Sequence, residues 1–317
     1  MTMRIITLEE HFASPDLMDR FGRQSFHNKV EQLCDLNERR IAEMDDAGID
    51  MQVLSLNSPG TEPLAAEEAV KIAGNANDFL AAAIERNPRR FAGFAALPTA
   101  DPDLAADELE RMVIQHGFRG AVINGHIQGR YLDDKFFWPI LEQAEALKVP
   151  IYLHPAPPPQ TIIDTYYTGN FSSEVTRLLS TAGWGWHIET AVHILRLILS
   201  GAFDRYPKLQ IIIGHMGEAL PFMLQRIDSV LQPNLTKLQR PMADYLRENI
   251  YYTFSGFNFT AAFLELFLQV GVDRIMFSAD FPYGSMAKGR DFLIQLPVSS
   301  TDREKIAHGN AELLLRL

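Results

Sequence analysis

The chain is poor in cysteine, has no excess of basic residues and contains no long apolar run. Cys34 is the one cysteine among 317 residues, which excludes an intrachain disulfide and a zinc site built on cysteines. Acidic residues outnumber basic ones by 40 to 29, for a net charge of −11. We therefore expect no general binding of nucleic acid or of anionic membranes, because both need a basic surface.

Two further absences concern location. No apolar run reaches the roughly 18 residues that a membrane-spanning helix requires. The first residues also lack the apolar stretch of a secretory signal, so we expect a cytoplasmic protein. What is present is an ordinary globular mixture of 47% hydrophobic and 22% charged residues.

Short apolar segments alternate with longer amphipathic ones along the whole chain. The pattern predicts eight strands, and it predicts helices between them. The strands are expected at 3–8, 50–56, 91–97, 120–123, 150–153, 209–213, 250–254 and 274–278, and the helices at 41–47, 65–84, 102–116, 136–147, 189–199, 219–230 and 261–270, with helical material to the C-terminus.

Continuous apolar strands between helices are typical of a parallel sheet buried on both faces. Eight such units in about 300 residues predict an α/β fold of the TIM-barrel type, a single (β/α)8 domain over residues 1–317. A doubly wound open sheet is the alternative, but no glycine-rich dinucleotide fingerprint follows the first strand.

One connection, 155–188, is long and rich in proline and aromatic residues. We expect it to be a loop that acts as a lid or a subunit contact.

Polar residues gather where the predicted strands end. In a barrel of this type the carboxyl ends of the strands form the catalytic face, so these side chains are expected to share one site. They are Glu9, Glu10 and His11 after the first strand, Asn57, Asn124, His154, His215 with Glu218, Ser255, and Asp280 after the last.

Four of these residues predict a metal site. Glu9 and His11 are two apart, so on an extended segment both point the same way, while Glu10 faces away. With His154 and Asp280 they make a set of two imidazoles and two carboxylates, which suits Zn²⁺, Mn²⁺ or Fe²⁺. The fourth strand ends in Asn124 and not in a lysine, so no carbamylated bridging ligand is available there and one ion is expected.

The remaining histidines are expected to be structural. They are His27, His116, His126, His187, His193 and His308. Glu189 and His193 are four apart on a predicted helix, which favours a surface pair over a pair of ligands.

Several motifs together resemble the amidohydrolase superfamily, in particular the subgroup of aminocarboxymuconate-semialdehyde decarboxylase and the hydroxybenzoate decarboxylases. Within it they are similar to those of the γ-resorcylate (2,6-dihydroxybenzoate) decarboxylases, which share the Glu-x-His variant of the usual His-x-His motif. The motifs are LEEHF (8–12), LSLN (54–57), FAALP (94–98), YLHP (152–155), ETAVH (189–193), IGHMGE (213–218) and FSADFP (277–282).

The resemblance implies an activity and a role for each site residue. The activity is metal-dependent, non-oxidative decarboxylation of an ortho-hydroxybenzoate in a homodimer or homotetramer. One Zn²⁺ or Mn²⁺ would be held by Glu9, His11, His154 and Asp280. Catalytic roles are expected for Asp280 as proton donor and for His215 with Glu218, and contacts to a small aromatic carboxylic acid are expected from Phe12, Asn57, Asn124, His215 and Arg226.

Hydrolysis of a lactone or an amide on the same site is the alternative function. There a metal-activated water would attack a carbonyl group and Asp280 would act as base. Glu9, where the superfamily usually has histidine, favours the decarboxylase. Trp184 and Trp186 are expected to add an apolar wall for a flat ring.

Overall fold

The computed structural model describes residues 3–317. The side chain of His27 lies outside that description, so the structural role expected for it stays a prediction. None of the described helices is long and apolar enough to cross a membrane.

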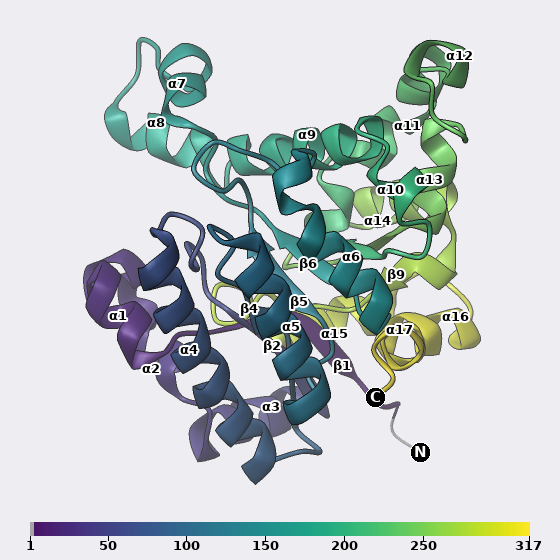
Figure 1. Cartoon of the computed structure of the whole chain (residues 1–317). Helices are drawn as coiled ribbons and strands as arrows, with labels where there is room; N and C mark the ends of the chain where they lie inside the picture. The colour runs from purple at the N-terminus through teal and green to yellow at the C-terminus, as the bar shows by residue number, and fades with distance from the viewer. Residues whose placement is uncertain (1–2) are drawn as a thin grey trace.

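Parallel strands form the centre of the molecule, and helices surround them (Figure 1). The strands are β1 (Ile6–Phe12), β2 (Met51–Leu56), β3 (Phe91–Gly93), β4 (Ala95–Ala96), β5 (Ala121–Asn124), β6 (Ile151–His154), β7 (Ile211–Ile213), β8 (Ile250–Thr253) and β9 (Ile275–Met276).

The strand pairing runs from β1 to β3 and from β4 to β9, and every pair is parallel. The expected strand 91–97 is divided at Phe94, whose N–H donates to the Leu54 carbonyl at 2.9 Å. At the other seam Leu8 bridges to Ser278, and its N–H donates to the Phe277 carbonyl at 3.1 Å. The fold is therefore the predicted (β/α)8 barrel.

The expected helices are confirmed to within a few residues. Asp101 shows why: its side chain accepts from the Leu104 N–H and Pro102 follows, as expected at a helix start. The helices are α1 (Pro15–Phe21), α2 (Val30–Cys34), α3 (Glu38–Ala47), α4 (Ala66–Arg86), α5 (Pro102–His116), α6 (Trp138–Leu147), α7 (Gln160–Ile162), α8 (Ser173–Ser180), α9 (Gly185–Leu199), α10 (Ala202–Arg205), α11 (Leu220–Val230), α12 (Pro233–Thr236), α13 (Met242–Glu248), α14 (Thr260–Val270), α15 (Met286–Gln295), α16 (Ser300–Glu304) and α17 (Asn310–Leu315), with short 3₁₀ or π-helical turns η1 (Arg23–Lys29), η2 (Lys135–Phe137), η3 (Ile163–Tyr167), η4 (His215–Gly217), η5 (Val272–Arg274) and η6 (Lys305–Gly309).

The segment 155–188 differs from the long loop that was expected, whereas its expected role as a lid or a subunit contact stays a prediction. Most of this segment is helical, because α7, η3 and α8 occupy it and α9 begins at Gly185. In Figure 1, α7 and α8 stand out from the barrel.

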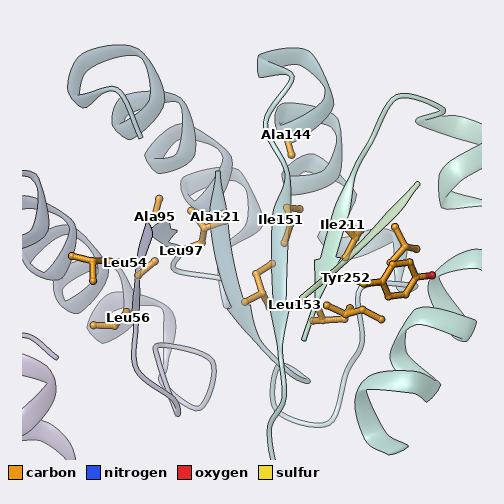
Figure 2. Close-up of a cluster of buried hydrophobic side chains, with 14 of the residues drawn as sticks. Leu54, Leu56, Ala95, Leu97, Ala121, Ala144, Ile151, Leu153, Ile211 and Tyr252 are labelled. Atoms are coloured by element: carbon orange, nitrogen blue, oxygen red, sulfur yellow. The ribbon is translucent and has the colours of Figure 1, made fainter. Parts of the chain in front are cut away.

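Alternate residues of each strand pack on two different cores. Leu54, Ile151 and Ile211 belong to the outer set, between the strands and the helices (Figure 2). Val122 and Tyr152 belong to a second cluster that fills the barrel. Since side chains alternate along a strand, Asn124 and His154, two residues further on, point to the same interior at its carboxyl end.

The first strand is longer than expected and contains a β-bulge. It runs to Phe12, so Glu9 and His11 lie within it and not after it. The register with β2 shifts between Thr7 and Glu10, and Glu9 has a φ of 60°. One extra residue reverses the alternation of side chains. The bulge thus turns Glu9 and His11 toward the interior, where strict alternation from Leu8 would have placed Glu10.

Candidate metal centre and catalytic site

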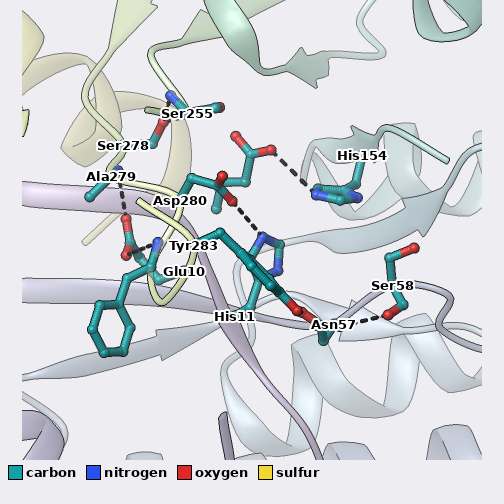
Figure 3. Close-up of polar contacts among 12 residues, drawn as sticks. Glu10, His11, Asn57, Ser58, His154, Ser255, Ser278, Ala279, Asp280 and Tyr283 are labelled. Atoms are coloured by element: carbon teal, nitrogen blue, oxygen red, sulfur yellow. Dashed lines mark hydrogen bonds and ion pairs between the residues drawn. The ribbon is translucent and has the colours of Figure 1, made fainter. Parts of the chain in front are cut away.

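The four predicted metal ligands meet at the carboxyl end of the barrel. Figure 3 labels three of them, His11, His154 and Asp280. One donor atom from each of Glu9, His11, His154 and Asp280 lies within 4.8 Å of the others. Nε2 of His11 is 3.1 Å from Oδ1 of Asp280, and Nε2 of His154 is 3.5 Å from Oε1 of Glu9. Strands β1 and β6 and the turn after β9 supply these side chains.

The chemistry of this cluster fits a divalent cation. Oε1 of Glu9 is buried and has no hydrogen-bond partner among the described residues, and leaving such an oxygen unsatisfied is costly. Burial, together with the charge of Asp280, raises the pKa of Glu9 to about 8, although the positive charge of His215 opposes this. A cation would satisfy the free oxygen and balance both carboxylates, so the residues are able to hold one metal ion.

Neighbouring side chains fix the Glu9 carboxylate. Its Oε2 accepts hydrogen bonds from the Tyr152 hydroxyl and, at 3.4 Å, from the Thr253 hydroxyl. A Cβ atom on Gly214 would lie 2.7 Å from the same oxygen and 2.5 Å from the Ser255 hydroxyl. Only glycine therefore leaves room for Glu9 at this point of the barrel.

Five polar residues of this site have left-handed backbone conformations. They are Glu9 (φ 60°), His215 (φ 51°), Glu218 (φ 54°), Ser255 (φ 48°) and Asp280 (φ 59°). Each such residue costs on the order of 1–3 kcal/mol and persists only where the surroundings enforce it. Backbone strain is therefore present on residues that were predicted to share the site.

Beside the metal ligands, Glu218 joins two histidines. Its Oε1 lies 2.7 Å from Nδ1 of His215, and its Oε2 lies 2.6 Å from Nδ1 of His187. Burial lowers the pKa of His215, but the negative charges of Glu218 and Glu9 outweigh it and raise the pKa to about 10. Burial raises the pKa of Glu218, and the positive charge of His215 reverses this, so that the pKa is lowered. The pair is therefore a carboxylate and an imidazolium.

His187 is one of three site residues that the sequence reasoning missed. It was expected to be structural, yet it lies against Glu218 and its ring centroid is 4.6 Å from that of His215. Its own position gave no signal, because it precedes the helix predicted from residue 189 and follows no strand. Tyr152, at Glu9, and Tyr283, whose ring centroid is 5.8 Å from that of His11, were missed as well.

The expectation of a surface pair at Glu189 and His193 is wrong. Both residues are buried and they bind different partners. Glu189 accepts a hydrogen bond from the Tyr131 hydroxyl, and Nε2 of His193 accepts from the Leu132 N–H at 2.9 Å. These two hydrogen bonds connect the segment after β5 to α9.

The residues predicted to contact substrate fall into two groups. Asn124 pairs with His154 in the β5–β6 ladder, and Asn57 accepts a hydrogen bond from the Tyr283 hydroxyl at 3.0 Å, so both lie at the site. Phe12 does not line it, because it is completely buried and stacks on Phe79 of α4. Arg226 is exposed on α11, outside the cluster.

The tryptophans also differ from each other. Trp184 is half exposed, so it does not form a closed wall. The indole N–H of Trp186 donates to Nε2 of His187 at 3.1 Å, which places Trp186 beside the histidine pair.

A (β/α)8 barrel with two histidines and two carboxylates gathered at its carboxyl end defines a metal-dependent barrel enzyme. The family model described as amidohydrolase matches residues 24–317. The chain belongs to the amidohydrolase family.

The chain is also similar to individual enzymes that are named as decarboxylases. The chain is 41% identical to a γ-resorcylate decarboxylase of a Polaromonas species, over 98% of each chain. A crystal structure of dihydroxybenzoic acid decarboxylase from Polaromonas, with bound manganese and the inhibitor 2-nitroresorcinol, matches with a TM-score of 0.91 and 40% identity, over 100% of this chain and 98% of that one. A 2,6-dihydroxybenzoate decarboxylase complexed with 2,6-dihydroxybenzoate matches with a TM-score of 0.90 and 38% identity over 100% of both chains.

Proposed function

We propose that the protein catalyses the metal-dependent, non-oxidative decarboxylation of an ortho-hydroxybenzoate, with γ-resorcylate as the candidate substrate. The observation that carries the proposal is full-length similarity at about 40% identity to enzymes named for this reaction. The predicted ligand set fits it, because all four residues converge in one buried cluster.

Glu9, His11, His154 and Asp280 would hold the cation. When bound, the ion would supply a Lewis acid that polarises the oxygens of the substrate. His215, as an imidazolium held by Glu218, is placed to donate a hydrogen bond to a substrate oxygen. Asn57 and Asn124 are the further polar contacts that we propose for the ring substituents.

Asp280 is the proposed proton donor. Removing the carboxylate directly would leave a costly aryl carbanion, whereas protonating the ring carbon first avoids it. The proton passes from the Asp280 carboxyl group to that carbon while the ionised ortho hydroxyl supplies electron density. The bond between the ring and the carboxylate then breaks, CO₂ leaves, and the bonding electrons restore aromaticity. The aspartate regains a proton from solvent before the next turnover.

A homodimer or homotetramer is proposed on the exposed apolar surface of α11 and α14. Phe222 and Leu268 are each 78% exposed, which favours a partner surface. Arg226 lies one turn from Phe222 on the same helix, so a contact between Arg226 and substrate would have to cross a subunit interface. Sedimentation velocity of the wild type should show an oligomer that Phe222→Glu dissociates. A cytoplasmic location stays a prediction.

The function is tested with purified protein loaded with Mn²⁺. We expect stoichiometric CO₂ and resorcinol from 2,6-dihydroxybenzoate, and loss of activity with a chelator that added Mn²⁺ restores. Hydrolysis of lactones or amides without any CO₂ release from hydroxybenzoates would overturn the proposal in favour of the alternative function.

The ligand set is tested by metal analysis. Glu9→Ala and His154→Ala should each bind less manganese than the wild type, because each removes one of four ligands. Full occupancy in both variants would show that the cluster is not the metal site.

A further inference from the structure

Glu10 points away from the metal ligands beside it and binds the backbone on either side of another ligand (Figure 3). Its Oε1 accepts a hydrogen bond from the Ala279 N–H at 2.8 Å, and its Oε2 accepts one from the Phe281 N–H at 3.2 Å. Asp280 is the residue between Ala279 and Phe281 in the chain. Glu10 is completely buried, so it cannot touch a substrate.

The two hydrogen bonds act on a strained turn. Asp280 has a φ of 59°, a conformation that residues other than glycine rarely adopt. Successive N–H groups that converge in such a turn form a concave anion site, and here the anion is a side chain of the same protein. The Glu10 carboxylate thus favours the backbone conformation from which Asp280 reaches His11.

Two buried polar residues, Gln52 and Arg40, bind Glu10 and His11 on the side away from the metal ligands. Gln52 donates to Oε2 of Glu10 at 3.4 Å. Arg40, itself buried, donates to the His11 carbonyl at 2.7 Å and lies over the Phe281 ring at 4.9 Å from its centroid. The His11 N–H in turn donates to the Phe281 carbonyl at 2.8 Å. The segments that carry Glu9, His11 and Asp280 are therefore joined through Glu10 and its neighbours.

We propose that Glu10 is a positioning residue, which places the Asp280 carboxylate at the metal cluster by holding the Ala279 and Phe281 amides. The catalytic part of this inference rests on the proposed function, whereas the part that concerns metal affinity does not. Groups that orient metal ligands typically change metal affinity or activity by about 10–100-fold when they are replaced.

Two variants test the proposal without removing the side chain. Glu10→Gln keeps the length but turns an NH₂ group toward one of the amides. Glu10→Asp keeps the carboxyl group but is one methylene too short to reach both amides. We expect each to weaken Mn²⁺ binding by about 10–100-fold in an equilibrium titration. At saturating Mn²⁺ we expect a lower kcat with a KM near that of the wild type.

Asn310→Ala is the matched control, because Asn310 of α17 binds the start of β9, whereas Glu10 binds the turn that follows this strand. The Asn310 amide donates to the Val272 and Ile275 carbonyls at 2.8 and 2.7 Å where β9 begins. This variant should lower the melting temperature but leave the Kd for Mn²⁺ and kcat unchanged.

The proposal is overturned if both Glu10 variants bind Mn²⁺ within twofold of the wild type, or if Asn310→Ala weakens Mn²⁺ binding equally. A wild type that binds Mn²⁺ but releases no CO₂ would overturn the proposed function, and the titration would still decide the role of Glu10.

Discussion

Nδ1 of His187 lies 2.6 Å from Oε2 of Glu218, a carboxylate 31 residues further along the chain. The other oxygen of Glu218 binds His215. A carboxylate held at both oxygens cannot rotate, so His187 fixes the orientation of Glu218 and, through it, that of His215. The other ring nitrogen of His187, Nε2, lies 3.1 Å from Nε1 of Trp186 and 3.1 Å from the Ala182 carbonyl oxygen. Toward the Glu218 carboxylate, which can only accept, Nδ1 is the donor.

Replacing His187 tests this arrangement. His187→Leu leaves a buried carboxylate oxygen without its donor, and hydrogen bonds to charged groups contribute about 1.5–3 kcal/mol. We expect kcat/KM to fall by about tenfold or more, measured by steady-state decarboxylation. His187→Asn carries an amide nitrogen where Nδ1 stood and should retain most of the activity. Equal losses in both variants would contradict a role through the hydrogen bond.

Asp280→Asn separates proton donation from binding. An amide retains an oxygen ligand but carries no acidic proton, so kcat should fall by about 10²–10⁴-fold, the range of general acid catalysis. Binding of a substrate analogue, followed by calorimetry, should persist. Asp133→Asn, which alters a surface partner of Arg196, serves as the control. Substantial turnover in Asp280→Asn would mean that another group supplies the proton.

Glu218→Gln should change the pH dependence of activity. Glu218 makes the largest contribution to the raised pKa of His215, about 10 in the folded protein. A raised pKa means that the cationic form persists at low pH and is lost as the pH rises through that value. Without the carboxylate this loss moves to lower pH, so the alkaline limb of the kcat profile should shift downward.

The control for the pH dependence of Glu218→Gln is a variant that removes one negative charge from α5, away from the site. Glu108→Gln affects a carboxylate that pairs with Arg111 on α5, and its alkaline limb should match that of the wild type. If the alkaline limb of the kcat profile were the same in Glu218→Gln and in the wild type, the loss of the proton from His215 would not be its cause.

Gly214→Ala should disturb the metal centre by steric contact alone. Its φ of −87° suits alanine, but the new methyl group would press on Glu9 and Ser255. We expect Mn²⁺ affinity to fall by about tenfold or more, because Glu9 must move. Gly74→Ala in α4, where a Cβ meets nothing within 4 Å, should leave Mn²⁺ affinity unchanged. Unaltered affinity in Gly214→Ala would mean that Glu9 is not a ligand.

Much of the fold and most of the ligand cluster could be predicted from local patterns. Apolar strands with capped helices between them identify the barrel because the period of side chains and the capping residues are properties of neighbouring positions. The carboxyl ends of parallel strands converge, so His154 and Asp280 were predicted to share a site although 126 positions separate them. Phe12 was wrongly expected to contact substrate, because the alternation that turns Glu9 and His11 inward turns the next residue outward, where it stacks on Phe79.

The sequence by itself determined which residues stand at the strand ends and hence which of them could bind a metal. Only the tertiary structure decided which of them face the interior and what supports them. The bulge at Glu9 reverses the alternation of β1, Glu10 meets the turn around Asp280 across the seam of the barrel, and α9 brings His187 to Glu218. Each of these depends on how distant elements pack, and the spacing of residues along the chain contains no measure of that.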